Sequence, residues 1–415
     1  MTLPLSREQQ SVLHRSASIP LLVSTIAMTI AVQALASMAI VVPTVLAPVA
    51  ASELGVQASR IGILVAFMYF VAIGTGLICD TLIARFGPVR VFEFAVVLVA
   101  VGLASGFGGN LGVVIFLGAL AGAAIGFVNP ASSTILLQVS PPRYRSLIFS
   151  IKQTGVPLGS AIASVLIPAL LQHLHWRDAV LVLGVGSAFV LVVVAPFRST
   201  YDRDRNPHQR IRLSAIGAPV AEIWSRRELL TLALTSAVYS AVQMSCFTYL
   251  MLYLIVELGY SLVLAGLVFS AAQVMGIIGR PVWGVVADRF QAPRQLLAGL
   301  GIAMGLCGLA AALFTPALPV AAIVAVCAVY GASAVGWNGV FLAEVARIAP
   351  PGKVGTVTGG VMLFNFSGAV LGPPAFGAIL GFTGSYTLGF LFIGLLPLVW
   401  GLRLALAPRA AAAGN

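Results

Sequence analysis

Charged side chains are scarce in this sequence of 415 residues. Lysine, arginine, aspartate and glutamate together make up 8% of it, whereas hydrophobic residues make up 60% and the mean hydropathy is +1.04. Soluble globular domains carry about a quarter of their residues as charged side chains. The composition therefore excludes an ordinary soluble protein and predicts a chain whose main partner is the lipid bilayer.

Cysteine and enzyme signatures are also missing or rare. The four cysteines, Cys79, Cys246, Cys307 and Cys327, all fall in apolar segments, so we expect packing residues rather than disulfides or metal ligands. The glycine-rich stretch 106–110 lacks the Gly-Lys-Ser/Thr of a phosphate loop, and neither HExxH nor GxSxG occurs. We therefore expect no enzyme activity, no cofactor and no metal site.

Long runs without charge give the number of membrane crossings. A hydrocarbon core about 30 Å thick needs roughly 20 apolar residues for each helix that spans it. The runs that supply one helix are 16–52, 61–79, 153–176, 179–197, 229–256 and 258–279, and those that supply two are 94–142, 295–343 and 354–402. We predict an all-α integral membrane protein with twelve transmembrane helices.

The chain also repeats itself. Glu53-Leu54-Gly55 recurs 204 residues later as Glu257-Leu258-Gly259, and Arg85-Phe86 recurs as Arg289-Phe290. At a spacing of 209, Asn129 corresponds to Asn338 and a Pro-Pro pair corresponds to another. A repeat this long indicates duplicated architecture, and in membranes such repeats frame transport pathways.

The basic residues lie mainly on one side of the predicted helices. With the N-terminus in the cytoplasm, 19 of the 23 lysines and arginines fall in cytoplasmic segments, as the positive-inside rule requires. The net charge of +11 is then a feature of topology, and we expect no nucleic-acid partner.

The first apolar run is too long for a cleavable signal peptide. We expect a monomer in the inner (plasma) membrane with both termini cytoplasmic. The predicted parts are an N-terminus (1–19), a six-helix bundle (20–197), a cytoplasmic central loop (198–227), a second six-helix bundle (228–406) and a tail (407–415).

Twelve helices in two parallel repeats around a basic central loop resemble the major facilitator superfamily over residues 20 to 406. Its loop signature is present as Gly284, Asp288-Arg289 and Arg294. In the first half Ala84 occupies the position of the acid, and whether Asp80, one turn earlier, replaces it stays open. The resemblance implies gating and assembly roles for the charged residues near these loops, although surface ion pairs explain them about as well. The residues concerned are Asp80, Arg85, Arg90, Asp288, Arg289, Arg294, Glu344 and Arg347.

The segment from Gly279 to Asp288 looks like helix 8 of the facilitators that carry monocarboxylates, oxalate or nitrate. The resemblance implies that Arg280, the arginine before Pro281, binds the negative charge of the substrate. Arg280 lies eight residues before Asp288, about 12 Å inside the membrane boundary, where an arginine usually faces a cavity or a partner. The alternative is a structural contact to helix-end carbonyls or to Asp288.

Lys152 lies at a similar depth in the fifth predicted helix. The resemblance places helices 5 and 8 side by side, so it implies that Lys152 and Arg280 approach each other. Two like charges in a low-dielectric interior repel unless an anion lies between them. We therefore predict an anion bridging the two, against the alternative that Lys152 snorkels to the interface and binds lipid phosphate.

Several uncharged polar residues lie near the predicted midplane. A buried amide in hydrocarbon needs a partner, which a polar cavity supplies; hydrogen bonds between helices are the alternative. Among the aromatic residues at this level, Tyr69, Phe247, Tyr330 and Trp337, we select only Trp337 for the pocket. The predicted substrate-binding set is Arg280, Lys152, Asn129, Asn338, Gln33, Gln243, Tyr239 and Trp337, with Ser236 and Ser240 on the face of Tyr239 and Gln243.

No aspartate or glutamate lies near the middle of a predicted helix, and the histidines fall in loops or at helix ends. No obvious proton carrier is therefore present, which weakens a drug/proton antiporter interpretation. We predict a secondary transporter that moves a small organic or inorganic anion, with a carboxylate as the preferred class. The transport mode is anion exchange, uniport or proton symport. The alternatives are an exporter of amphipathic or toxic compounds and a membrane sensor without transport.

Overall fold

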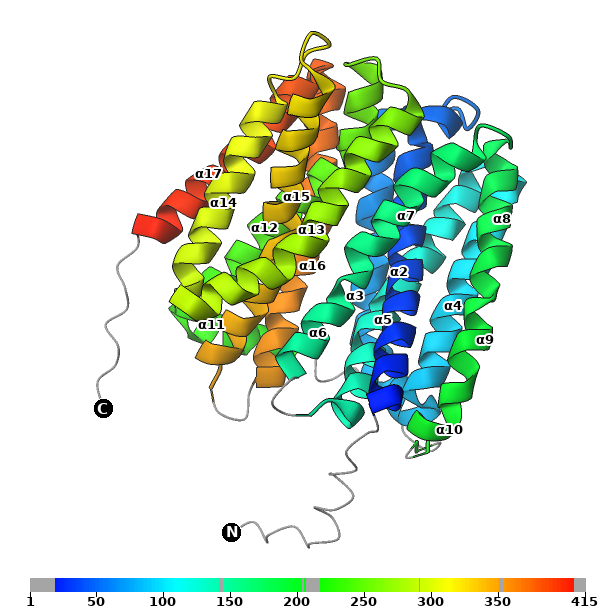
Figure 1. The fold of residues 1–415 in the computed structure, drawn as a ribbon, viewed down its shortest axis with the longest axis vertical. Coiled ribbons are helices and arrows are strands. Elements are labelled where there is room, and N and C mark those ends of the chain that lie inside the picture. The colour runs from blue at the N-terminus through cyan, green and yellow to red at the C-terminus, as the bar shows by residue number, and fades with distance from the viewer. Residues whose placement is uncertain are drawn as a thin grey trace, which may run out of the picture.

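The computed structural model describes residues 19–141, 145–203, 205–206, 217–290, 292–350 and 354–406. These residues form helices and short turns, with no strand among them. Figure 1 shows the helices of the first half of the chain packed beside those of the second half. The all-α prediction is confirmed for the described part of the chain.

Within the described residues, twelve helices are long and apolar enough to cross a membrane, as the charge-free runs predict. In the first half the helices are α2 (Ile19–Ala50), η1 (Ala58–Arg60), α3 (Ile61–Phe86), α4 (Pro88–Ser105), η2 (Gly106–Gly108), α5 (Leu111–Val139), α6 (Arg145–Gln153), α7 (Gly155–Leu170), α8 (Trp176–Ala188), α9 (Val190–Val194), η4 (Ala195–Phe197) and α10 (Arg198–Tyr201). In the second half they are α11 (Gly217–Ser225), α12 (Arg227–Val256), α13 (Leu262–Phe290), α14 (Pro293–Ala311), α15 (Val320–Ile348), α16 (Val354–Thr383) and α17 (Tyr386–Leu406).

The predicted turn at 106–110 shows why a long apolar run divides into two helices. Gly109 adopts a left-handed conformation with φ of 63°, which glycine takes without steric cost. The side chain of Asn110 then accepts a hydrogen bond from the Val113 N–H at 3.0 Å, so it caps the first turn of α5. The stretch is a turn and helix cap, as its sequence indicates.

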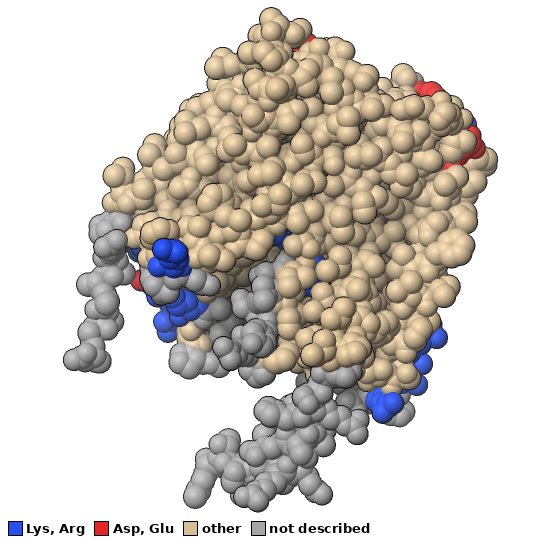
Figure 2. All heavy atoms as spheres, in the orientation of Figure 1, with Lys and Arg blue, Asp and Glu red and all other residues tan. Residues whose placement is uncertain are grey.

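Figure 2 shows lysine and arginine gathered at the lower end of the molecule, below a band of uncharged surface. We call this the basic end. The terminal helix turns there carry Arg85 on α3, Arg90 on α4, Arg198 on α10 and Arg289 on α13. Between the two halves at this end the surface is hollowed, and blue atoms show in the recess (Figure 2). The two halves meet mainly along two helix pairs, α3 with α16 and α7 with α13, and α12 also contacts α2.

At the opposite end the two halves touch through glycines. The Tyr249 hydroxyl donates to the carbonyl of Ser59 at 2.8 Å and accepts from the Gly62 N–H at 3.2 Å. A Cβ atom placed on Gly62 would lie 2.5 Å from the carbonyl oxygen of Pro373, and one on Gly266 would overlap that of Ser164. Glycine therefore permits the backbones of the two halves to approach closely at this end.

A cluster around Glu53 fastens the opposite end of the first half. The Glu53 carboxylate accepts from Trp176 Nε1 at 3.0 Å, contacts His175 Nε2 at 3.0 Å and lies 3.4 Å from Arg177. The hydrogen bonds from Trp176 and then His175 lower the pKa of Glu53 below its usual value. The cluster ties the loop after α2 to the start of α8.

The beginning of the central loop is fixed to the first half at the basic end. Arg198 forms an ion pair of 2.6 Å with Glu93, which is buried on α4, and Tyr201 hydrogen-bonds Thr25 at 2.6 Å. Asp202 accepts from the N–H groups of Val89 and Arg90 at 2.8 and 3.2 Å. Since Pro88 opens α4 without an N–H, Asp202 satisfies the next two donors of that helix. The loop between α3 and α4, where Ala84 occupies the position of the signature acid, thus receives a carboxylate from the central loop. Sequence analysis missed this partner.

We expect Asp202→Ala to destabilise the protein by about 0.5–2 kcal/mol, the usual cost of losing a helix N-terminal acceptor. Asp202→Asn keeps one acceptor oxygen and is expected to cost less. The apparent melting temperature of the purified protein in detergent measures both. Equal melting temperatures for the alanine variant and the unmodified protein would show that this contact does not stabilise the fold.

Candidate functional site

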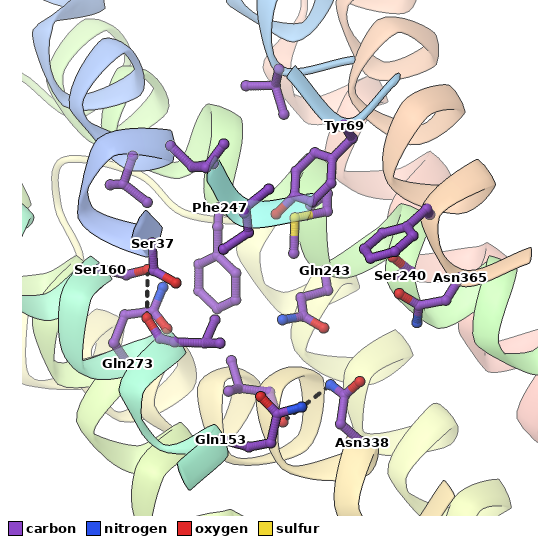
Figure 3. Close-up of a pocket in the computed structure, with 18 of the residues that line it drawn as sticks. Ser37, Tyr69, Gln153, Ser160, Ser240, Gln243, Phe247, Gln273, Asn338 and Asn365 are labelled. Carbon is purple, nitrogen blue, oxygen red and sulfur yellow. Dashed lines mark hydrogen bonds between the residues drawn. The ribbon is translucent and has the colours of Figure 1, made fainter. Parts of the chain in front are cut away.

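A cavity of about 170 Å³ lies between the two halves of the chain. Its lining comes from α2, α3, α5, α6 and α7 in the first half and from α12, α13, α15 and α16 in the second. Figure 3 shows polar side chains from several sides of the cavity, together with the aromatic rings of Tyr69 and Phe247. The position between repeats matches the expected place of a transport site.

Five of the eight predicted substrate-binding residues line this cavity: Gln33, Asn129, Gln243, Arg280 and Asn338. The two asparagines at equivalent positions of the repeat, Asn129 on α5 and Asn338 on α15, therefore face one cavity from opposite halves. This shared position follows from the duplication, because equivalent residues of two packed repeats meet at the interface between them.

Arg280 both lines the cavity and contacts backbone carbonyls. It is 7% exposed; its Nε donates to the carbonyl of Val335 at 3.2 Å, and one Nη donates to the carbonyl of Gln153. That carbonyl lacks its helical donor because residue 157, four positions later, is a proline. Both predicted environments of Arg280, helix carbonyls and a cavity, are present together. A guanidinium has five N–H donors, so two carbonyl contacts leave donors for a ligand.

Lys152 lies beside the cavity rather than in its lining. Its side chain is buried, and its Nζ donates to the Asn129 Oδ1 at 2.8 Å. The alternative in which Lys152 snorkels to the interface is wrong for this structure. Arg280 is bound to the carbonyl of the residue after Lys152, and the two cations are close enough to repel each other. The fifth predicted span (α6 and α7) and the eighth (α13) therefore lie side by side in the structure, as expected.

Tyr239 and Trp337 are corrections to the predicted set, because neither lines the cavity. The Tyr239 hydroxyl donates to the carbonyl of Leu297 at 2.7 Å, and its ring packs edge-on against Trp337. Trp337 is fully buried and donates through Nε1 to the Gln243 Oε1 at 3.2 Å. One residue along a helix turns the side chain by about 100°, so Ser240 faces the cavity while Tyr239 faces α14. Trp337 thus hydrogen-bonds a lining residue, Gln243, without lining the cavity itself.

Sequence analysis missed seven uncharged polar residues of the lining: Ser37, Thr44, Gln153, Ser160, Thr248, Gln273 and Asn365. Its choice of Trp337 also passed over Tyr69 and Phe247. Two of these had a signal in the sequence. Gln273 precedes Arg280 by seven residues and therefore shares its helix face. Gln153 precedes Pro157 by four, which frees its carbonyl. The other positions depend on helix rotation, which the uniformly apolar runs do not record.

The cavity has positive charge near it and no matching acid in the described lining. Arg280 is the charged residue among the lining side chains, which otherwise are amides, hydroxyls and apolar groups, with no Asp, Glu or His. Lys152 adds a second cation through Asn129. A buried cation is costly unless a counter-charge or a hydrogen-bond acceptor compensates it. Carbonyl and amide oxygens supply acceptors for these two cations, but the described lining supplies no counter-charge.

The predicted gating residues lie at the basic end, and the contacts that the structure gives stay within one half of the chain. Arg347 binds the buried Glu344 three residues earlier through two hydrogen bonds of 2.6 and 2.7 Å. Arg90 donates to the carbonyl of Phe86 at 3.3 Å, and Arg85 lies over the Phe86 ring. Arg289 is exposed and Arg294 is half-buried, while the side chains of Asp80 and Asp288 lie outside the described residues.

The family model described as "Major Facilitator Superfamily" matches residues 28–373. The chain is 27% identical over 303 residues to an uncharacterized MFS-type transporter of Mycobacterium tuberculosis (strain CDC 1551 / Oshkosh), which covers 69% of this chain and 62% of that protein. The chain thus matches less than two thirds of the length of this relative.

Two further relatives carry substrate names. The chain is 24% identical over 377 residues to the probable sulfoacetate transporter SauU of Cupriavidus necator, covering 85% of this chain and 86% of that protein. It is 26% identical over 259 residues to monocarboxylate transporter 13 of Bos taurus, covering 61% of this chain and 57% of that protein.

Solved structures share the fold. The peptide transporter POT in complex with sulfate superposes with a TM-score of 0.76 at 17% identity, over 97% of both chains. A bacterial homolog of the lysosomal transporter Spinster superposes with a TM-score of 0.72 at 16% identity, over 94% of this chain and 96% of that one.

Proposed function

This chain belongs to the major facilitator superfamily of membrane transporters, and we propose that it carries a small organic anion, a carboxylate, across the membrane by alternating access. The observation that carries the proposal is the cavity between the halves, lined by Arg280 and adjoined by Lys152, with no acid in its described lining. The relatives named for sulfoacetate and monocarboxylates support the same class of substrate.

In the proposed mechanism the free donors of Arg280 bind the anionic group, while the nearby Lys152 adds to the attractive potential. Asn129, Asn338 and Gln243 orient the rest of the substrate through their amides. The bound anion compensates both cations, which lowers the cost of enclosing them when the two halves close around the site. The residues at the basic end, including Glu344 and Arg347, remain predicted gate residues.

The size of the cavity favours a small substrate over an amphipathic drug. Pockets for drug-sized ligands measure about 300–1,000 Å³, whereas this cavity measures about 170 Å³. Its polar amides and hydroxyls also suit a hydrogen-bonding anion better than a large apolar cation.

We further propose that the protein lies in the inner membrane with its basic end facing the cytoplasm. This orientation rests on the basic residues at that end and on the positive-inside rule.

Thermal stabilisation of the purified protein tests this function, because a ligand that binds the folded state raises apparent stability. The panel contains mono- and dicarboxylates, a sulfonate, inorganic anions, sugars and cationic drugs. We expect carboxylates to raise the melting temperature of the unmodified protein, and Arg280→Gln to abolish that increase. Arg403→Gln, which removes an exposed arginine of α17, is the matched control and should keep it. Stabilisation by drugs alone, equal in all three proteins, would refute the carboxylate assignment.

A further inference from the structure

Gln33 has no hydrogen-bond partner for either polar atom of its side chain among the described residues. The residue is fully buried on α2, and both the Nε2 and the Oε1 are inaccessible and unbonded. Ser37, one turn later on the same helix, is 4% exposed, and its hydroxyl is likewise unbonded. Both residues line the cavity. Leaving a buried polar group without a hydrogen-bond partner costs free energy. A ligand in the cavity can supply the partners that Gln33 and Ser37 lack.

The position of Gln33 is fixed by a close contact with α7. A Cβ atom on Gly155 would lie 2.9 Å from the Gln33 Cβ and 2.9 Å from the carbonyl oxygen of Ile30, so the glycine lets the two helices approach at this level. Gly155 follows Lys152 by three residues and Gln153, whose carbonyl holds Arg280, by two. The helix around Gln33 therefore packs against the segment that carries Lys152 and the carbonyl bound by Arg280, and neither cation hydrogen-bonds the Gln33 amide.

The same flank of the cavity carries other uncharged groups. In the view of Figure 3, Ser37, Ser160 and Gln273 lie on one side of the cavity, and Ser240, Gln243 and Asn365 lie on the other. Gln273 is 4% exposed and lies two turns before Arg280 on α13, about 10 Å along the helix. The flank around Gln33 and Ser37 thus offers amide and hydroxyl groups but no charge, next to an anion-binding arginine.

From this arrangement we infer that Gln33 and Ser37 form a subsite for a neutral hydrogen-bonding group of the substrate, so that the protein prefers small anions that carry a hydroxyl or carbonyl group beside the anionic one. The inference rests on the proposed function, since the anionic group is held by Arg280. An amide both donates and accepts, and a hydroxyl does the same, so the pair binds a hydroxyl in either direction. A site built to hydrogen-bond a substrate group discriminates against the analogue that lacks it.

Matched acids that differ by one hydroxyl test the subsite. Glycolate is compared with acetate, and lactate with propionate, by ligand-dependent thermal stabilisation and by uptake into liposomes. We expect the unmodified protein to bind each hydroxy acid about threefold to tenfold more tightly than its partner, the value of one hydrogen bond to a neutral group. In Gln33→Met and in Ser37→Ala, the ratio of the affinity for the hydroxy acid to the affinity for its unsubstituted partner is expected to fall toward one. Because either variant alone can fail to fold, the two serve as independent tests.

Thr29→Val is the matched control, since Thr29 is a buried residue one turn before Gln33 on α2, bonded to the Ile26 carbonyl and outside the cavity lining. It should retain the full hydroxy-acid ratio. Equal affinity for the paired acids in the unmodified protein, or an unchanged ratio in folded Gln33→Met and Ser37→Ala, would refute the subsite while leaving anion transport intact. Failure of every carboxylate to bind would instead refute the proposed function and the subsite with it.

Discussion

Replacing Gly62 or Gly266 by alanine is expected to lower transport about 10-fold to 100-fold while the protein still folds. The two glycines are equivalent residues of the repeat, 204 positions apart, and each faces a backbone carbonyl of the other half. Gly62 of the first half meets the Pro373 carbonyl of the second, and Gly266 of the second meets the Ser164 carbonyl of the first. Ser164 and Pro373 are themselves 209 positions apart, the spacing of the second part of the repeat.

The size of this effect follows from what the added methyl group meets. In both cases it would overlap backbone of the other half, which cannot move away as a flexible side chain can. Overpacking costs about 1–3 kcal/mol, and each 1.4 kcal/mol changes a population tenfold. The cost falls on the form in which this end is closed, so the protein shifts toward the form in which this end is open.

Uptake into liposomes measures the loss, and thiol labelling measures the shift. The four native cysteines are buried, so Met244→Cys in the cavity lining supplies a reporter, and an impermeant reagent added opposite the basic end should label it faster in the glycine variants. Gly74→Ala is the control on α3, because a Cβ atom there meets nothing within 4 Å. If Gly62→Ala, Gly266→Ala and Gly74→Ala all transport equally, the glycine contact does not close this end.

Replacing Lys152 by methionine is expected to weaken anion binding about 10-fold to 100-fold and to stabilise the empty protein. Lys152 is a buried cation near Arg280 whose described hydrogen bond is to the Asn129 amide. An uncompensated buried ion costs several kcal/mol, and methionine fills a similar volume without that cost. Asn129 lines the cavity, so water there can replace the lost donor.

The two effects have opposite signs, which distinguishes a binding role from a structural one. Melting temperature without ligand should rise by about 2–4 °C for each kcal/mol gained, whereas the increase caused by a carboxylate should shrink. Arg226→Met, at an exposed position before α12, controls for loss of one positive charge and should change neither. A lower melting temperature together with unchanged carboxylate binding would assign Lys152 to the fold instead.

The sequence alone determined the membrane architecture of this protein. Hydropathy and helix length act locally, because each span must cross the same thickness of hydrocarbon, so the twelve spans and the turn at 106–110 could be predicted without tertiary contacts. The repeat added the equivalence of Asn129 and Asn338, and the depth of Arg280 and Lys152 followed from counting residues along a helix. These inferences use only distance along the chain.

Only the tertiary structure decided which polar side chains face the cavity and which face a neighbouring helix. In uniformly apolar helices the hydrophobic pattern does not fix rotation about the helix axis, and one residue changes the direction by about 100°. Tyr239 and Trp337 therefore turned out to be packing residues, while Gln273 and Asn365 line the cavity. In the same way, packing between distant segments made Asp202 the acceptor for α4 and left the Gln33 amide without a partner among the described residues. Such contacts depend on how two helices pack against each other. The sequence of either helix alone does not specify that packing.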